Sequence, residues 1–324
     1  MSEVKLILGT MTFGESVFNP AVEEFINVFL NAGYDELDTA YVYNNGDCER
    51  LLGEAMVNIH KPYKIATKIN PRISGKLDAD AAYTQLNESL QRMNIESVDT
   101  VYLHFPDPAT PVASVLSAMA DLHEQGKFKE LGLSNFPAWM VADVWHICDK
   151  NGWVKPTVYE GIYNPLTRKA ETELNAALNH FGLRFYAYNP LAGGILTGRY
   201  KNFEDKPGDG RFTHRPNYQG RYWKKSYFDA VKVIEEATKK KKQDFSRVEF
   251  LTYDEGLCVQ CMHNGSYDDE PATVELMHNY MEEKGYELDI TDKRYHHEIY
   301  LSDPRKCDVS KLKTVIRHPI KKIK

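Results

Sequence analysis

Four polar side chains of different chemistry follow or end successive strand-like runs in the first third of the chain: Asp38, Tyr43, Lys68 and His104. A phenol has a pKa near 10, so Tyr43 needs a cation beside it to exchange a proton at neutral pH. Lys68 would be that cation, and Asp38 would keep it charged and oriented. His104 could hydrogen-bond the oxygen of a carbonyl substrate. The set suits reduction of a C=O group by hydride from a nicotinamide cofactor, with Tyr43 as the proton donor.

The segments that must position these residues alternate between strand-like runs and amphipathic helices as far as about residue 240. Repeated βα units build a parallel sheet, because parallel strands need a crossover helix. The pattern predicts an α/β fold, a TIM (β/α)8-type barrel for which only seven strands are found. Strands are predicted at 6–10, 36–39, 63–68, 100–104, 130–134, 157–162 and 184–188, with helices at 20–32, 48–57, 78–93, 112–125, 138–150 and 169–181.

In such a barrel the carboxyl ends of the strands gather at one rim, where chemistry is found. The four residues above therefore converge there, together with Ser134, Asn135, Glu160, Tyr188 and Asn189. Residues 191–225 are rich in Gly, Pro, Arg and aromatics, which favours a ligand-covering loop over a routine connection. A helix is predicted to follow from about residue 225 to residue 241.

The alternation of strands and helices ends and the charge balance changes near residue 237. This change predicts a domain 1–237 and a second segment 238–324. This segment reads as small and α+β, with strands at 248–253, 256–263 and 295–301 and a helix at 270–284. Residues 248–253 could occupy the place of the eighth barrel strand. Alternatively, the whole segment 238–324 could fold outside the barrel or pair with a second copy in a homodimer.

The amino-acid composition limits which partners the chain can bind and in which cellular compartment it is expected. The chain has 324 residues, with 46 acidic against 40 basic side chains. This balance excludes the strongly basic face of a nucleic-acid-binding protein. No apolar run is long enough for a membrane helix, no signal peptide precedes the first strand, and five cysteines favour a reducing cytoplasm. Cys258 and Cys261 point to opposite faces of a strand, so no metal site is predicted.

Five motifs occur in order along residues 5–237: LDTAYVY at 37–43, ATK at 66–68, YLH at 102–104, GLSNF at 132–136 and FYAYNPLAGG at 185–194. Together they resemble the aldo-keto reductases, and most closely the aflatoxin-aldehyde and succinic-semialdehyde reductase branch. The resemblance implies a (β/α)8 barrel, NADPH as cofactor and a small carbonyl substrate. It also implies that Asp38, Tyr43, Lys68 and His104 form the catalytic tetrad.

The same resemblance implies the cofactor contacts. Ser134 and Asn135 would bind the nicotinamide carboxamide, with Glu160 beside it where relatives usually have Gln, and Tyr188 would stack on the ring. The segment from Asn189 to Arg199 would line the pyrophosphate, with Arg211 as a further cofactor contact and Tyr200 and Arg221 as substrate contacts beside His104. Within the lining segment the residues concerned are Asn189, Pro190, Leu191, Gly193, Gly194 and Arg199. The family segment that carries the eighth strand and grips the 2′-phosphate has no counterpart after Lys241.

A second resemblance covers residues 240–324. The segments GLCVQCMH at 256–263, GSYDDEP at 265–271 and HHEIYLSDP at 296–304 resemble the second half of a GyrI-like small-molecule-binding domain. In that family an acidic residue on the last strand often faces the ligand, which here would be Glu298. The sequence thus predicts NADPH-dependent reduction of small aldehydes or ketones, the alternative being a non-catalytic small-molecule-binding protein on an incomplete reductase barrel.

Overall fold

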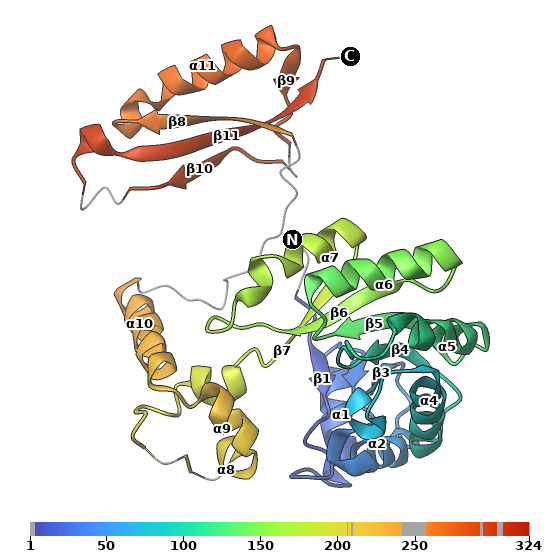
Figure 1. Ribbon diagram of the computed structural model, residues 1–324. Coiled ribbons are helices and arrows are strands. Elements are labelled where there is room, and N and C mark those ends of the chain that lie inside the picture. The colour runs from blue at the N-terminus through green and yellow to red at the C-terminus, as the bar shows by residue number, and fades with distance from the viewer. Residues whose placement is uncertain are drawn as a thin grey trace. The chain divides into compact units, whose positions relative to one another are not determined.

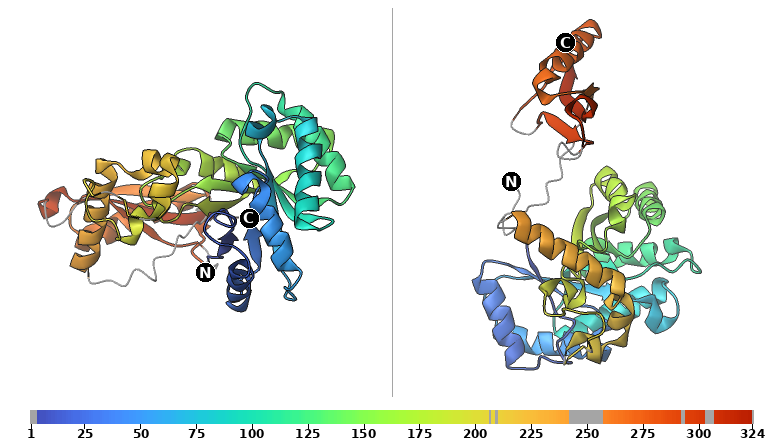
Figure 2. Two further views of the ribbon diagram at one scale, coloured as in Figure 1. Left: turned by 90° about the horizontal axis from the view of Figure 1, so that it is seen from below. Right: turned by 90° about the vertical axis from the view of Figure 1, so that its left-hand side faces the viewer.

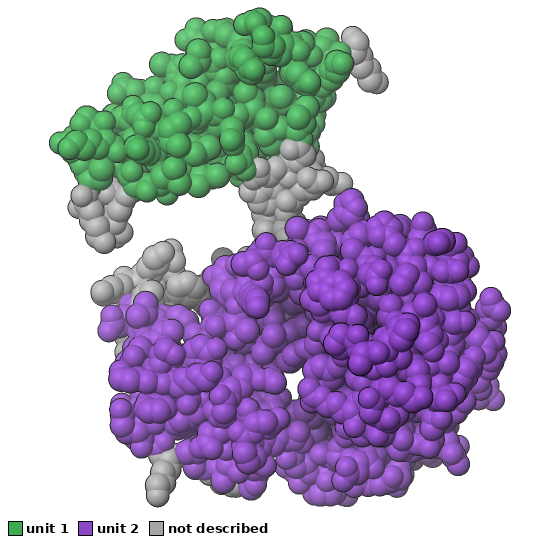
Figure 3. Space-filling view, in the orientation of Figure 1, with its two compact units in different colours: residues 1–2, 246–324 green, residues 3–245 purple. Residues whose placement is uncertain are grey.

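The computed structural model describes residues 4–205, 207–208, 210–241, 257–291, 294–302 and 307–323. The chain divides into two compact units, residues 3–245 and 246–324 with residues 1–2 (Figure 3). The larger unit contains a seven-stranded parallel sheet in the order β1-β2-β3-β4-β5-β6-β7 (Figure 1). Its strands are β1 (Ile7–Gly9), β2 (Glu36–Asp38), β3 (Lys64–Ile69), β4 (Val98–Leu103), β5 (Phe128–Ser134), β6 (Pro156–Ile162) and β7 (Arg184–Tyr188).

The connecting helices lie along the outer face of the curled sheet (Figures 1 and 2). The α4 segment shows why such a helix forms: its apolar residues Ala82, Leu86, Leu90 and Met93 recur on one face and are all buried. The Asp78 side chain accepts a hydrogen bond from the Ala81 N–H and caps the start of the helix. The connecting helices are α1 (Ala21–Asn31), α2 (Asp47–Met56), α3 (Pro71–Ser74), α4 (Ala79–Met93), α5 (Val112–Glu124), α6 (Ala138–Asn151) and α7 (Leu174–Phe181).

The predicted fold class is confirmed, because seven parallel strands curl into a TIM-like half-barrel. Among the described residues, β1 pairs with β2 alone and β7 pairs with β6 alone. Residues 248–253, proposed for the gap, lie outside the described residues, so that placement stays a prediction.

The stretch 191–225 differs from the irregular loop that the sequence predicts, because it contains α8 (Arg211–His214) and α9 (Pro216–Tyr222). The helix predicted to follow it is confirmed as α10 (Lys225–Lys241). The reason for the difference is the aromatic content of the stretch, since these rings bury one another in a core of their own. We call this core the aromatic cluster; it comprises Phe212, Tyr218, Tyr222 and Phe228, with Tyr200 and Trp223 packed against it.

The smaller unit is an antiparallel sheet covered by one helix. Its strands run in the order β10-β11-β8, and β9 pairs with the far end of β11. The helix α11 packs on the sheet through Met277 and Met281 against Val259 and Ile316. The predicted α+β character is therefore confirmed, although β9 and β11 were not predicted. The elements are β8 (Cys258–Asn264), α11 (Glu270–Glu283), β9 (Tyr286–Leu288), β10 (His297–Tyr300) and β11 (Lys313–Lys322).

None of the described helices combines the length and the apolar character needed to cross a lipid bilayer.

Candidate active site

Lys68, on β3, is the central charge of the site and is fully buried. Its Nζ contacts the Asp38 carboxylate, donates to the Thr39 carbonyl oxygen at 2.9 Å and lies 3.3 Å from Glu160 Oε2. Burial alone would lower the pKa of Lys68, but the two carboxylates outweigh burial and raise it. Lys68 is therefore a permanent cation in the half-barrel.

Tyr43 lies in the turn Tyr43–Gly46 that follows β2, and Lys68 Nζ is 5.3 Å from the centre of its ring. Burial raises the pKa of Tyr43 above its usual value, while the Lys68 charge acts in the opposite direction. The phenol is thus neutral and holds a proton that it can give. The next residue, Asn44, fixes the turn because its side-chain amide donates to the carbonyl oxygens of Met11 and Phe13 at 3.0 and 2.6 Å.

His104 follows β4, and its backbone N–H donates to the Ile69 carbonyl oxygen at 2.9 Å. Its ring stands nearly perpendicular to the Tyr43 ring, with the two centres 5.9 Å apart. Burial, with the charges of Lys68 and Arg72, lowers the pKa of His104 to about 2. The imidazole is therefore neutral and can act as a hydrogen-bond donor beside the phenol.

Glu160, on β6, places a second carboxylate on the same ammonium as Asp38. Burial and the Asp38 charge raise the pKa of Glu160 to about 7, against the opposing charge of Lys68. Burial also raises the pKa of Asp38. Two carboxylates compete for one cation here, because Lys68 can neutralise only one negative charge.

Ser134, Asn135 and Tyr188 form a second polar group next to His104. The Asn135 amide donates to the His104 carbonyl oxygen at 3.0 Å and to Ser134 Oγ at 2.9 Å. The Tyr188 hydroxyl donates to Asn135 Oδ1 at 2.7 Å, which joins β7 to the end of β5. Asn135 has a φ of 62°, a left-handed conformation that Asn tolerates well. The structure therefore brings these three predicted cofactor residues together.

The segment after β7 runs close against the aromatic cluster. Asn189 donates to the Tyr222 hydroxyl at 3.1 Å and accepts from the Tyr218 hydroxyl at 3.3 Å. Gly193 has a φ of 69°, and a Cβ there would lie 3.0 to 3.3 Å from Tyr222, Tyr218 and Phe212. Gly194 also has a positive φ, whereas Leu191, which follows Pro190, is exposed. A side chain at position 193 would therefore be both crowded and conformationally strained.

Three arginines lie against the rings of this region, whereas Tyr200 is part of its packing. Arg211 lies over the Tyr218 ring at 5.2 Å, Arg221 over the Tyr222 ring at 5.9 Å and Arg199 over the Tyr200 ring at 5.7 Å. Tyr200 packs edge-on against Phe212 and Trp223. Arg221 also opposes the burial that raises the pKa of Tyr188 to about 12.

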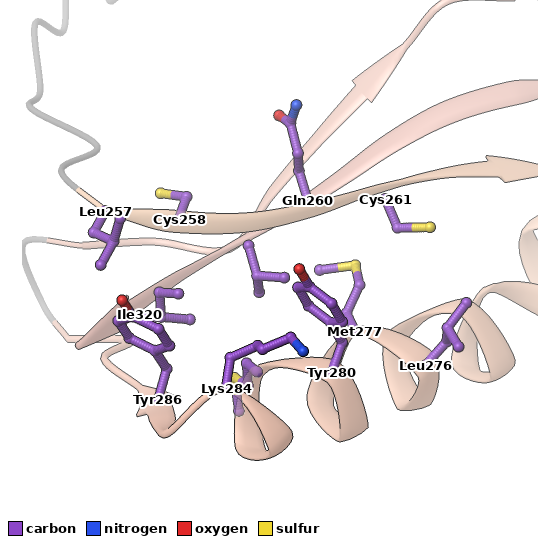
Figure 4. A pocket seen from close by; sticks show the side chains of 12 residues that line it. Leu257, Cys258, Gln260, Cys261, Leu276, Met277, Tyr280, Lys284, Tyr286 and Ile320 are labelled. Atoms are coloured by element: carbon purple, nitrogen blue, oxygen red, sulfur yellow. The ribbon is translucent and has the colours of Figure 1, made fainter. Parts of the chain in front are cut away.

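Two hollows of the smaller unit are each lined in part by residues of α11. The first, of about 520 Å³, lies between α11 and β8. Met277 and Tyr280 project from the helix toward the strand, and Lys284 lies at the C-terminal end of the helix (Figure 4). The second, of about 530 Å³, is lined by three carboxylates, three aromatic rings and two apolar side chains: Tyr267, Glu270, Pro271, Val274, Glu275, His278, His296 and Glu298.

Glu298, on β10, is the predicted ligand contact of this segment and lines the second hollow. It accepts a hydrogen bond from the Tyr300 hydroxyl and pairs with His296 Nε2 at 2.8 Å. These two partners lower the pKa of Glu298, so the hollow contains a carboxylate at neutral pH.

A model of the aldo/keto reductase family matches residues 5–250. The chain belongs to the aldo/keto reductase family. It is 47% identical over 243 residues to aflatoxin B1 aldehyde reductase member 2 of Homo sapiens, covering 72% of this chain and 67% of that protein. The protein of the same name from Rattus norvegicus is 46% identical over 242 residues, covering 72% of this chain and 66% of that protein. Aldo-keto reductase family 7 member A3 of Homo sapiens is 46% identical over 240 residues, covering 71% of this chain and 72% of that protein.

This chain thus spans about two thirds of the length of the aflatoxin aldehyde reductases that it matches. A model of the GyrI-like small molecule binding domain matches residues 217–321 and overlaps the reductase match along α10. Both resemblances that the sequence predicts are confirmed by these matches.

The side chains of this aldo/keto reductase fit a nicotinamide dinucleotide. Ser134 and Asn135 offer donors and acceptors of the kind that a carboxamide needs. The close backbone at Gly193 and the arginines of the following segment suit a pyrophosphate. Glu160 fits less well than the Gln of relatives, because it adds a negative charge and lacks the amide donor.

Sequence reasoning missed two residues that the structure brings to the site. Arg215 follows α8, makes a bidentate ion pair with Glu15 at 2.6 to 3.0 Å and donates to Asn44 Oδ1 at 3.2 Å. Asn70 follows β3 and lies 3.2 Å from His104 Nδ1. Nothing in the sequence pairs Arg215 with residues so far away, but the Asn70-Pro71 pair is a helix-start signal that could have drawn attention to Asn70.

Proposed function

We propose that this chain catalyses the NADPH-dependent reduction of small aldehydes or ketones to alcohols. The observation that carries the proposal is the buried Lys68 ammonium, held by Asp38, lying against Tyr43 with the neutral His104 ring beside them. Tyr43 would give a proton to the carbonyl oxygen and Lys68 would stabilise the phenolate that remains. Asp38 would orient Lys68, and His104 would donate a hydrogen bond to the same oxygen.

When bound, the nicotinamide would supply the hydride. Ser134, Asn135 and Glu160 would hold its carboxamide, and Tyr188 would lie on its ring. The segment with Asn189, Pro190, Leu191, Gly193, Gly194 and Arg199 would line the pyrophosphate, with Arg211 as a further phosphate contact. Arg221 and Tyr200 would contact substrate.

The test is a Tyr43→Phe variant with Tyr41→Phe as its matched control. Tyr41 is two residues away, and its hydroxyl donates to Glu88 at 2.5 Å instead of facing Lys68. We expect Tyr43→Phe to abolish aldehyde-dependent NADPH oxidation while the fluorescence titration of NADPH binding stays nearly unchanged, and Tyr41→Phe to keep turnover. Full turnover by Tyr43→Phe would refute the role of the phenol, and the same assay with NADH tests the cofactor preference.

We further propose that the reductase occupies residues 1–237 and that residues 238–324 form a small-molecule-binding segment, in a protein of the reducing cytoplasm. The odd number of cysteines, five in a chain of 324 residues, supports this compartment. The second hollow favours an aromatic cation as ligand, because aromatic rings and the ionised Glu298 line it. Titration with the fluorescent cation ethidium tests this binding, and an unchanged signal at millimolar probe would exclude it.

A further inference from the structure

We propose that Asn70 is a positioning residue that fixes His104 as the tautomer with its hydrogen on Nε2. The inference rests on the proposed reductase function, in which His104 must donate a hydrogen bond to the carbonyl oxygen. It assigns the task of selecting the donor nitrogen to a residue outside the four catalytic side chains.

The orientation of the Asn70 amide is set by chemistry. Asn70 caps α3, and its Oδ1 accepts from the Arg72 backbone N–H at 2.9 Å. A backbone N–H can only donate, so the oxygen of the amide must face Arg72. The NH₂ group is then the end that faces His104, where Nδ2 lies 3.2 Å from Nδ1.

Asn70 is also held rigidly. The Gln85 side chain, on α4, accepts from the Asn70 N–H at 2.8 Å and donates to the Asn70 carbonyl oxygen at 3.0 Å. Both residues are only 2% exposed, so water does not compete for these bonds. Gln85 holds the backbone of Asn70, and the Arg72 N–H holds its side-chain oxygen. The NH₂ group must therefore point toward His104.

The contact decides which nitrogen of His104 carries the hydrogen. Because the ring is neutral, it has one N–H and one lone pair. The Asn70 NH₂ group donates to Nδ1, so the lone pair is on Nδ1 and the hydrogen on Nε2. The charged groups near the ring, Lys68 and Arg72, both oppose a second proton. The ring plane is held by stacking on Phe105, with centres 4.8 Å apart.

The experiment is an Asn70→Asp variant of the full chain. The introduced carboxylate keeps the cap on Arg72 but offers only acceptors to His104, so the hydrogen moves to Nδ1 and Nε2 loses its donor. We expect kcat to fall by about 10² to 10³ at neutral and alkaline pH, as when one oxyanion donor is removed, with a smaller change in KM. As the pH is lowered, the carboxylate favours the imidazolium, which has a hydrogen on both nitrogens, and kcat should recover.

The control is Asn70→Ser, which keeps a cap but supplies neither amide nor carboxylate to Nδ1. We expect a smaller loss of kcat and no recovery in acid. Long-range ¹H–¹⁵N correlation spectra, assigned with His104→Gln, report the protonated nitrogen without turnover. They should show Nε2–H in the wild type, Nδ1–H in neutral Asn70→Asp and a mixture in Asn70→Ser.

Three results would overturn the inference: wild-type kcat in Asn70→Asp at every pH, hydrogen on Nδ1 in the wild type, or pure Nε2–H in Asn70→Ser. The last decides the matter if Asn70→Asp fails to fold. If the spectra behave as expected but the wild type reduces no aldehyde, the proposed function fails while the tautomer assignment is supported.

Discussion

Replacing Glu160 by Gln removes one of the two negative charges beside Lys68 and keeps the shape of the side chain. Asp38 contacts the ammonium, and Glu160 lies 3.3 Å from it. Burial and the Asp38 charge are the reasons why the pKa of Glu160 is raised to about 7. The ionised form of Glu160 is thus unfavourable in the folded chain, and a neutral amide does not share this penalty.

The magnitude follows from the difference between about 7 in the folded chain and the ordinary value of 4.5. At about 1.36 kcal/mol for each pKa unit, this corresponds to roughly 3 kcal/mol. Between these two values the folded chain binds more protons than the unfolded chain, so its free energy of unfolding falls as the pH rises. The penalty is absent below pH 4.5, grows up to about pH 7 and is complete above it.

We therefore expect Glu160→Gln to unfold like the wild type near pH 4.5 and to be more stable by up to roughly 3 kcal/mol at pH 8. For a unit of this size the melting temperature should rise by about 6 to 12 °C. Thermal unfolding followed by circular dichroism from pH 4.5 to pH 8 measures both.

A matched control is Glu130→Gln. Glu130 pairs with Arg184 on the surface, so this change should cost at most about 1 kcal/mol at pH 8. The reasoning is refuted if Glu160→Gln gives no gain at pH 8, or the same gain at pH 4.5.

Two further predictions concern Gly193 and Glu298. Replacing Gly193 by Ala places a Cβ 3.0 to 3.3 Å from three aromatic rings at a φ of 69°, so we expect a loss of about 1 to 3 kcal/mol in denaturant unfolding. Ala at Gly208, where a Cβ meets open space, is the control. Replacing Glu298 by Gln removes the carboxylate of the second hollow and should weaken ethidium binding about tenfold, whereas Glu287→Gln, on β9, should not; equal affinities would exclude the carboxylate as a contact.

The parallel sheet could be predicted because its strands are short apolar runs separated by amphipathic helices. The expectation that functional residues lie at the carboxyl ends of the strands selects Asp38, Lys68 and His104, and the structure places these three close together. Their roles stay predictions until the variants are measured. Strand β11 was not predicted, because Pro319 and several basic residues interrupt its reading as a strand. Burial nevertheless alternates from Thr314 through Ile316 to His318, and is interrupted only where Pro319 is buried beside Ile320.

Tertiary contacts explain what sequence reasoning could not reach. The helices between residues 211 and 222 have little apolar periodicity of their own, and their order comes from rings packing on one another. Asn70 matters because its amide meets His104, which is 34 positions away. Asp38 and Glu160 likewise compete for one ammonium although their strands, β2 and β6, are not adjacent in the sheet.

Within the described part of the chain β1 and β7 each have one neighbouring strand, which has a consequence for how the site moves. Strands β3, β4 and β5 each have neighbours on both sides and are largely buried, whereas no residue of β1 or β7 is fully buried. Hydrogen exchange should therefore be slowest in the middle strands and fastest at the ends. Lys68 and His104 come from the slow part and Tyr188 from a fast edge. Among the residues proposed to hold the nicotinamide, Ser134 at the end of β5 is therefore on a rigid support, whereas Tyr188 on β7 is on a more mobile one.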